Sequence, residues 1–354
     1  MGNVELGERK QKILTAVIDL YIRTGEPVGS KTLVDMLNHA VSSATIRNEM
    51  AELAAMGYLE QPHTSAGRVP TAAAFRLYID CLMHRRDLSD EDRRDIDGML
   101  THAAGDPERL IGEASEALAE ATGCAAVTTT PSGNTADLRR IEVMRVSGYS
   151  AALLLMTGSG LLRTRVCRFD REIGNGTLES LAQSLNNRFC GSALSDIGLP
   201  QVQSMVVTLG EDGLLCAPAL NAFYQLVQDT VEAEISLTGQ LNLLRHPDYD
   251  PERARDLLTF LARRELLSGL LTAMPKGLRV VIGSESQRPE LDGSSIIVTR
   301  YKLGGRPDGS IGIIGPQRMD YAATIPRIEY FARSIGKILD GIIGENKGKT
   351  SEEE

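Results

Sequence analysis

Two adjacent polar residues, Arg47 and Asn48, carry side chains that could hydrogen-bond to the edges of nucleic-acid bases. A guanidinium group suits guanine and a carboxamide suits adenine in the major groove of DNA. Ser43 and Thr45 lie just before them and add two hydroxyl groups. The apolar residues of this segment recur at helical spacing, at Ile46, Met50 and Leu53. With those residues in a core, the polar ones face outward at the start of a helix, where a major-groove helix makes its contacts.

A second polar group follows in a segment that predicts two short strands joined by a turn. Residues 58–60 favour a strand, 62–67 are turn residues, and Arg68 begins a returning strand. His63 and Thr64 lie in the turn. This pattern is typical of a wing, and beside the preceding helix it favours DNA contact over the solvated surface of a three-helix bundle.

The elements before these residues complete a helix-turn-helix. Residues 7–23 carry an apolar stripe at helical spacing and end before a Gly and a following Pro. Ser30 is a suitable cap for a short helix over 31–37, and Ser42 or Ser43 could cap the recognition helix. A helix, a short helix, a turn and an amphipathic helix is the order found in helix-turn-helix proteins.

The charge of the chain is distributed unevenly. The 354 residues hold 38 Lys and Arg against 47 Asp and Glu, a net charge of -9. Residues 1–86 hold 10 of those cations and 9 of those anions, a net of +1, so the remainder carries -10. DNA binding by this chain must therefore depend on a few placed cations rather than on a general positive field.

The remainder of the chain predicts an α+β body. A helix is expected at 72–84, and the charge-dense stretch 85–107 predicts a linker helix that buries little. The later segments alternate between strand and helix patterns. Strands are expected at 138–146, 151–156, 161–169, 205–209, 278–283, 294–301 and 311–315. Helices are expected at 108–122, 177–190, 219–235, 251–273 and 321–343. This order suggests one sheet domain interrupted by a largely helical insert.

Several classes of protein are disfavoured. The five cysteines and five histidines show no metal-ligand spacing, and we find no catalytic constellation, so we expect no metal, no cofactor and no enzymatic activity. No apolar run approaches the roughly 20 residues of a membrane span. The start of the chain lacks the apolar region of a signal peptide. We expect a cytoplasmic protein that does not enter a membrane.

Three segments resemble the heat-inducible transcription repressor HrcA, a bacterial family that controls chaperone operons. They are YIRTGEPVGSKTL at 21–33, VSSATIRNEMAELAAMGYLEQPHTSAGRVPT at 41–71 and GSIGIIGPQRMDYAATIPRIEYFA at 309–332. The resemblance implies a winged-helix domain, a GAF-like domain and a dimerising domain inserted into the GAF-like one. It also implies a homodimer that binds an inverted repeat, and a chaperonin, GroEL, that assists the repressor into its active form.

The resulting expectation is an α+β protein with an N-terminal winged helix-turn-helix and a GAF-like sheet domain interrupted by a mostly helical dimerisation insert. The expected divisions are a winged helix at 1–86, a linker helix at 87–107, GAF-like parts at 108–179 and 271–344, the insert at 180–270 and a polar tail at 345–354. The residues expected to contact DNA are Ser30, Lys31, Ser43, Thr45, Arg47, Asn48, His63, Thr64 and Arg68.

We expect a negative regulator of heat-shock operons that heat stress releases from its operator. The alternative is a metabolite-responsive winged-helix regulator with a small ligand in the GAF-like domain. A third class, an enzyme with an accessory DNA-binding domain, has no supporting set of residues.

Overall fold

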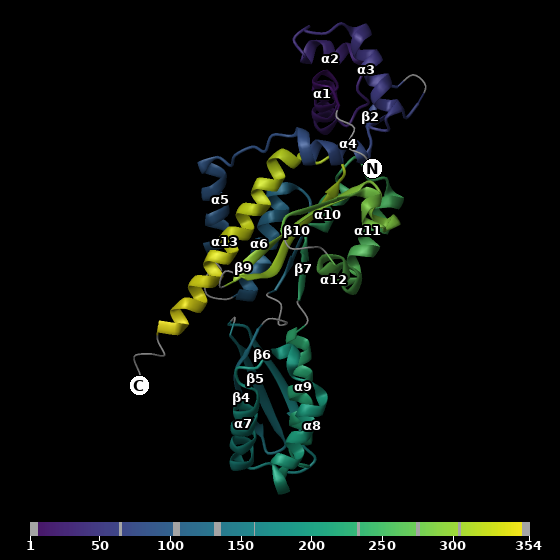
Figure 1. The fold of residues 1–354 in the computed structure, drawn as a ribbon. Coiled ribbons are helices and arrows are strands. Elements are labelled where there is room, and N and C mark those ends of the chain that lie inside the picture. Colours follow the sequence, from purple (N-terminus) through teal and green to yellow (C-terminus); the bar gives the residue numbers. More distant parts are fainter. Residues whose placement is uncertain are drawn as a thin grey trace.

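A computed structural model of the chain describes residues 6–63, 66–101, 107–130, 136–158, 160–231, 234–273, 277–303 and 306–348. The fold has three parts (Figure 1). A small N-terminal domain and a lobe inserted in the middle of the chain lie at opposite ends of a central sheet domain. The predicted α+β class is confirmed, with helices and strands in both the central domain and the lobe.

The N-terminal domain is a winged helix, as the sequence predicts. Its helices are α1 (Glu8–Thr24), α2 (Ser30–Met36) and α3 (Ser43–Ala55). Strands β1 (Leu59–Glu60) and β2 (Val69–Pro70) pair antiparallel and form the wing. The predicted helix over 72–84 divides into α4 (Ala72–Leu77) and a π-helical turn, η1 (Tyr78–Leu82).

The central domain is built on one antiparallel sheet of five strands in the order β7-β3-β10-β9-β8. Its strands are β3 (Ala125–Thr129), β7 (Ile235–Thr238), β8 (Arg279–Ile282), β9 (Ser294–Leu303) and β10 (Arg306–Pro316). Alternate residues of the sheet face two different cores. Ala126 and Ile313 face α6 (Pro107–Thr122) and α13 (Tyr321–Gly348), whereas Ala125 and Ile314 face α11 (Pro251–Ala262) and α12 (Arg264–Ala273).

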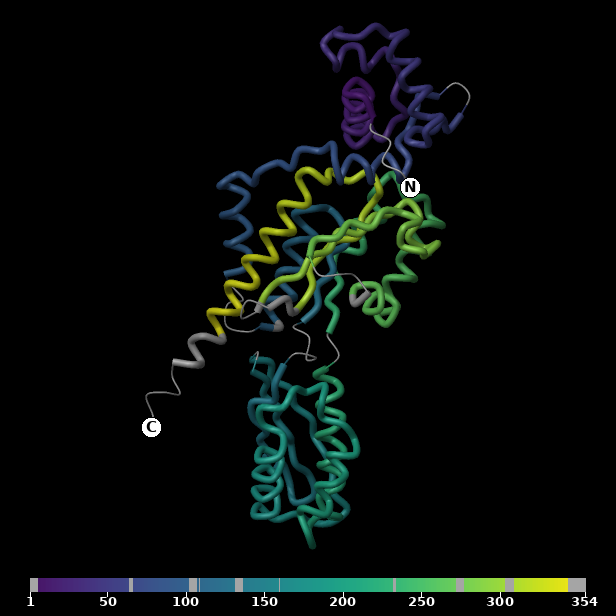
Figure 2. Tube along the Cα trace, in the orientation of Figure 1, coloured from purple at the N-terminus to yellow at the C-terminus, as the bar shows by residue number. Residues whose placement is uncertain are grey.

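The inserted lobe has a sheet and a core of its own. Strands β4 (Leu138–Ser147), β5 (Ser150–Thr157) and β6 (Leu162–Arg168) pair only with one another among the described strands. Three helices pack on one side of this sheet, the first and third directly against it and the second against the third, and Figure 2 shows the lobe apart from the central sheet. They are α7 (Asn175–Phe189), α8 (Leu199–Thr208) and α9 (Ala217–Val231).

The insert therefore differs from the expected 180–270. The chain leaves the central sheet after β3 and re-enters it with β7, so the lobe spans 136–231 among the described residues and is not mostly helical. Strands β4 to β6 belong to it rather than to the first part of the sheet domain. The strand expected at 205–209 is also wrong, because those residues belong to α8 and to the turn after it. Val202 and Met205 are both buried, so the segment follows a helical period.

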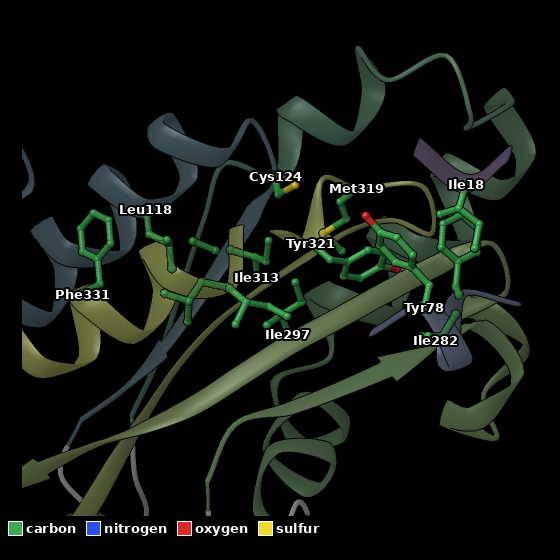
Figure 3. Packing of buried hydrophobic residues seen from close by; sticks show 14 of the residues in the cluster. Ile18, Tyr78, Leu118, Cys124, Ile282, Ile297, Ile313, Met319, Tyr321 and Phe331 are labelled. Atoms are coloured by element: carbon green, nitrogen blue, oxygen red, sulfur yellow. The ribbon is translucent and has the colours of Figure 1, made fainter. Parts of the chain in front are cut away.

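The winged helix and the central domain share one hydrophobic core (Figure 3). Ile18 of α1 and Tyr78 of η1 lie in the same cluster as Ile282, Ile297 and Tyr321 of the sheet domain. The predicted linker helix is present as α5 (Asp90–Thr101). Its charge suggested that it would bury little, but it packs against the central domain. Ile96 and Leu100 are buried against α6 and α13, while the acidic residues face solvent or pair across to α13.

Among the described residues, no helix is both long and apolar enough to cross a membrane.

Candidate nucleic-acid interface

The recognition helix, α3, is fixed by its apolar face and by its cap. Ile46, Met50 and Leu53 are 0%, 3% and 0% exposed, as the helical spacing predicts. Ser42 is the N-cap, and its hydroxyl accepts from the Thr45 backbone N–H at 3.2 Å. These contacts leave Arg47 and Asn48 exposed on the outer side.

A groove of about 420 Å³ separates the start of α2, the outer side of α3 and the returning limb of the wing. It contains four of the residues singled out in the sequence: Ser30, Lys31, Arg47 and Arg68. Three separate elements contribute these side chains. The structure therefore brings together residues up to 38 positions apart in the chain into one polar and cationic groove.

The remaining predicted residues lie around this groove. Ser43 is half-buried, and its hydroxyl is 3.1 Å from that of Ser30, which ties α2 to α3. Ser30 is thus the first residue of α2 rather than its cap; Gly29 holds the cap position without a side-chain bond. The Thr45 hydroxyl is 2.9 Å from that of Ser42, so it supports the cap, and Thr45 does not line the groove.

The turn of the wing is only partly described. His63 is exposed, and its carbonyl accepts from the Ala66 N–H at 2.9 Å, closing the turn. The Gln61 side chain donates to the Ala66 carbonyl at 3.0 Å. The predicted contact residue Thr64 lies outside the described residues.

The wing is joined to the helix-turn-helix by a short backbone bridge. Val28 and Arg68 exchange two N–H to carbonyl hydrogen bonds of 2.9 Å each. Gly67 permits this approach, because a Cβ there would lie 2.5 Å from the Val28 carbonyl oxygen. The sequence alone did not indicate the roles of Gly67 and Gln61, because these roles depend on Val28 and Ala66 as neighbours. The one signal for Gly67 was the presence of a glycine before Arg68 in the predicted turn.

The cations of the domain are divided between two surfaces. On the side where α1 meets α3, Lys10 is 2.9 Å from the carboxylates of both Glu49 and Glu52. Hydrogen bonds to Glu52 and then Glu49 raise the pKa of the Lys10 ammonium. Within the described part of the chain, Lys31, Arg47 and Arg68 form no ion pair with an acidic residue. The groove therefore keeps three cations available for an anionic ligand in a domain of net charge +1.

The described residues hold no group of three or more His, Cys, Asp or Glu side chains that could bind a metal ion. Both faces of the five-stranded sheet are filled by apolar side chains. The cationic groove of the winged helix is therefore the candidate functional site, because predicted DNA-contact residues line it.

The fold and the groove together define a transcription regulator that binds DNA through a winged helix. Residues 5–80 match the family described as the winged helix-turn-helix transcription repressor, HrcA DNA-binding. Residues 108–325 match the HrcA protein C-terminal domain. The chain belongs to the HrcA family of heat-inducible transcription repressors, which are DNA-binding regulators and not enzymes.

Relatives match over nearly the full length. The heat-inducible transcription repressor HrcA of Clostridium botulinum is 34% identical over 339 residues, covering 95% of this chain and 98% of the relative. The HrcA repressor of Moorella thermoacetica is also 34% identical, covering 95% of this chain and 99% of the relative.

One solved structure has the same overall fold, with a TM-score of 0.65 and 24% identity. It is described as the crystal structure of a hypothetical protein, and the match covers 96% of this chain and all of that one.

Proposed function

We propose that this chain represses heat-shock chaperone operons as a homodimer that binds an inverted repeat. The observation that supports the proposal most strongly is the groove that gathers Lys31, Arg47 and Arg68 beside the exposed side of α3. In this arrangement Arg47 and Asn48 read base edges in the major groove. Ser30, Lys31 and Arg68 hold phosphate or sugar groups, with Ser43, Thr45, His63 and Thr64 at the edges of the contact.

The inserted lobe offers a surface for the second copy. The face of its sheet that the helices do not cover carries exposed apolar side chains beside an Arg140–Glu142 ion pair, with Met144, Leu162 and Val166 exposed by 51%, 49% and 64%. Met144 and Val166 flank Ala152 across the three strands. Exposed apolar patches of this kind are typical of interfaces. A two-fold pairing of two such faces would place one winged helix at each half-site.

We propose further that heat relieves repression through the chaperonin GroEL. Chaperonin assists the repressor into its active form, and heat-damaged proteins that occupy the chaperonin leave the repressor inactive. The shared core of the winged helix and the sheet domain favours this route over local melting of a loose DNA-binding domain. Repression of chromosomal operons also implies a cytoplasmic protein.

The deciding experiment is footprinting on the organism's own chaperone promoters, with and without added chaperonin. We expect two protected half-sites related by an inverted repeat, and stronger protection when chaperonin is present. Protection of unrelated promoters to the same extent would contradict the proposal. A small metabolite that shifts both the melting temperature and operator affinity would instead support the metabolite-responsive alternative.

A further inference from the structure

The segment between β10 and α13 is part of the motif at 309–332, yet it lies away from the DNA groove. Together with the first turn of α13, it forms a surface of the central domain that contacts the winged helix. Phe75 of α4 lies between Tyr21 of α1 and Tyr321, the first residue of α13, in tilted ring contacts with centroids 6.5 and 6.0 Å away. The Arg86 N–H donates to the Ala322 carbonyl at 3.0 Å. The start of α13, directly after this segment, therefore contacts α4 and the last residue of the winged-helix domain.

Arg318 is a charged residue of this segment that contacts the winged helix. Its side chain is only 12% exposed and lies 2.6 Å through Nε from Oδ1 of Asp248, in the turn before α11. Its Nη1 donates to the Ile22 carbonyl in the last turn of α1 at 3.2 Å. The last carbonyls of a helix lack partners within the helix and carry its negative dipole end, so a guanidinium is well suited to them. Arg318 thus joins three segments that are far apart in the chain.

The end of α1 is shaped to receive this guanidinium. Gly25 caps the helix with φ 71°, and its N–H bonds to the Tyr21 carbonyl at 2.8 Å. A Cβ at Gly25 would lie 3.0 Å from Cζ and Nη2 of Arg318. The planar guanidinium therefore lies directly over the backbone of the cap. Hydrogen bonding and close packing together fix the direction of α1 relative to the sheet domain.

We propose that Arg318 is a positioning residue for operator binding: it fixes the angle of the winged helix on the body and so sets the half-site spacing that a dimer accepts. The proposal rests on the function proposed above. The 17 residues of α1 span roughly 25 Å. A tilt of about 10° at the Arg318 end would move the other end by about 4 Å, more than the ~3.4 Å rise of one base pair.

The first experiment measures the angle without DNA. Spin labels on Ala55→Cys in α3 and Lys337→Cys in α13 report the distance between the winged helix and the body, in a chain carrying Cys81→Ser and Cys190→Ser. The other cysteines are buried. Diluting labelled with unlabelled protein removes signals between subunits. We expect Arg318→Ala to broaden the distance distribution and Arg318→Lys to broaden it less, because lysine keeps the charge but lacks the planar fork.

The matched control is Arg327→Ala. Arg327 also joins a carboxylate, Asp92 at 3.0 Å, to a carbonyl, Ala121 at 3.4 Å, but all its partners lie within the body. We expect its distance distribution to equal that of the wild type. Unchanged distributions in both Arg318 variants would overturn the inference while leaving the proposed function intact.

The second experiment measures affinity for one half-site and for inverted repeats with different spacers. We expect Arg318→Ala to leave single half-site affinity unchanged, to weaken binding to the preferred spacing by about tenfold, and to flatten the spacing profile. A merely destabilised protein would weaken both kinds of site equally, which would overturn the inference. If the wild type itself showed no preference for an inverted repeat, the proposed function would fail and the spacing role with it.

Discussion

At the scale of single residues, Arg47 and Lys31 line the same groove but are expected to do different work. Arg47 extends from the exposed side of α3, where a guanidinium can pair with a base, whereas Lys31 lies in the first turn of α2 and is proposed to bind a DNA phosphate. We expect Arg47→Ala to cost about 1–3 kcal/mol of operator affinity and to flatten the preference at one base pair. Lys31→Ala should weaken all sequences alike and lower the salt slope by about 1.

Gel shifts on an operator and on single-base variants, each at several salt concentrations, measure both effects. Arg94→Ala serves as the control, since Arg94 is an exposed cation on α5, outside the winged helix. Unchanged affinity and unchanged base preference in both groove variants would rule out these assignments.

Gly67 allows a separate test of the wing. A methyl group at this position would meet the carbonyl oxygens of Val28 and Pro27 at 2.5 and 2.7 Å, so Gly67→Ala must push the wing away from the segment before α2. We expect a loss of DNA affinity that exceeds any loss of thermal stability, as measured by binding and melting on the same samples. Gly7→Ala is the control, because nothing lies within 4 Å of its Cβ. Full DNA affinity in Gly67→Ala would show that the wing position is unimportant.

The residue-level prediction from sequence succeeded where local periodicity decides the outcome. The helical wheel placed Arg47 outward and Ile46 inward, because both follow from one amphipathic segment. The roles of Gly67 and Arg318 could not be predicted in this way. Each depends on a backbone carbonyl that is distant in sequence, Val28 for Gly67 and Ile22 for Arg318, and a single sequence does not reveal such neighbours.

At the scale of elements, the cap of α3 makes a measurable contribution to stability. The Ser42 hydroxyl accepts from the Thr45 N–H, which otherwise has no partner within the helix. Ser42→Ala should cost about 1 kcal/mol in the free energy of unfolding. Chemical denaturation of the full chain, followed by helical ellipticity, measures this loss. The control is Ser89→Ala, which removes a capping hydroxyl at the start of α5, outside the DNA-binding domain. Only the Ser42 variant should weaken DNA binding as well.

The junction of α4 with the turn after β8 predicts a pH dependence. Arg76 Nε donates to Glu285 Oε1 at 2.9 Å, and the Ile282 N–H donates to Oε2 at the same distance. Burial raises the pKa of Glu285, but these hydrogen bonds and the charge of Arg76 outweigh it, so the pKa of the carboxyl lies below its usual value. The stabilisation is present above the unfolded pKa of about 4.3 and is lost as pH falls through the folded pKa.

Denaturation at a series of pH values tests this dependence. We expect the wild type to exceed Glu285→Gln in free energy of unfolding near neutral pH, and the difference to shrink as pH falls below about 4.3. Glu265→Gln, at an exposed position of α12, should show no such trend. A difference that stayed constant with pH would mean that the carboxylate charge does not hold the junction.

Element types followed from the sequence more reliably than their partners did. Strands over 138–169 were predicted as strands, yet they form the sheet of the inserted lobe and not that of the central domain. Alternation along a strand indicates which face is buried, but it does not specify which sheet the strand joins. Because a short apolar run fits either element, the run at 205–209 was predicted as a strand, but Val202 and Met205 are buried on one side of α8.

At the scale of the whole molecule, a nearly neutral winged helix is attached to a body of net charge -10. Long-range attraction to DNA is therefore weak, and the acidic body repels it. In the proposed homodimer, affinity comes from a few cations in the groove, presented twice. Dimerisation then contributes through effective concentration, which can exceed single-site affinity by about 10²–10⁴. The proposed dimer surface would then determine repression even though it is distant from the groove.

The uncovered face of the β4-β5-β6 sheet is the surface on which this dependence can be tested. Val166 is 64% exposed on the edge strand β6, at one end of a cross-strand row that has Ala152 in the middle and Met144 at the other end. Val166→Glu would bury an unpaired carboxylate in the proposed interface, where such a charge is costly. We expect a monomer in sedimentation equilibrium, unchanged affinity for a single half-site, and affinity for the inverted repeat lower by about 10²–10⁴.

The matched control is Val207→Glu. Val207 is 85% exposed on α8, on the helical side of the same lobe, so it introduces the same charge without touching the uncovered sheet face. It should remain dimeric and bind the inverted repeat as the wild type does. If Val166→Glu stayed dimeric while Val207→Glu dissociated, the helical side would be the interface. In that case the two copies would still pair through their lobes, with the helical side as the interface. The gain in affinity for the inverted repeat would remain, because it depends on the pairing and not on which surface provides it.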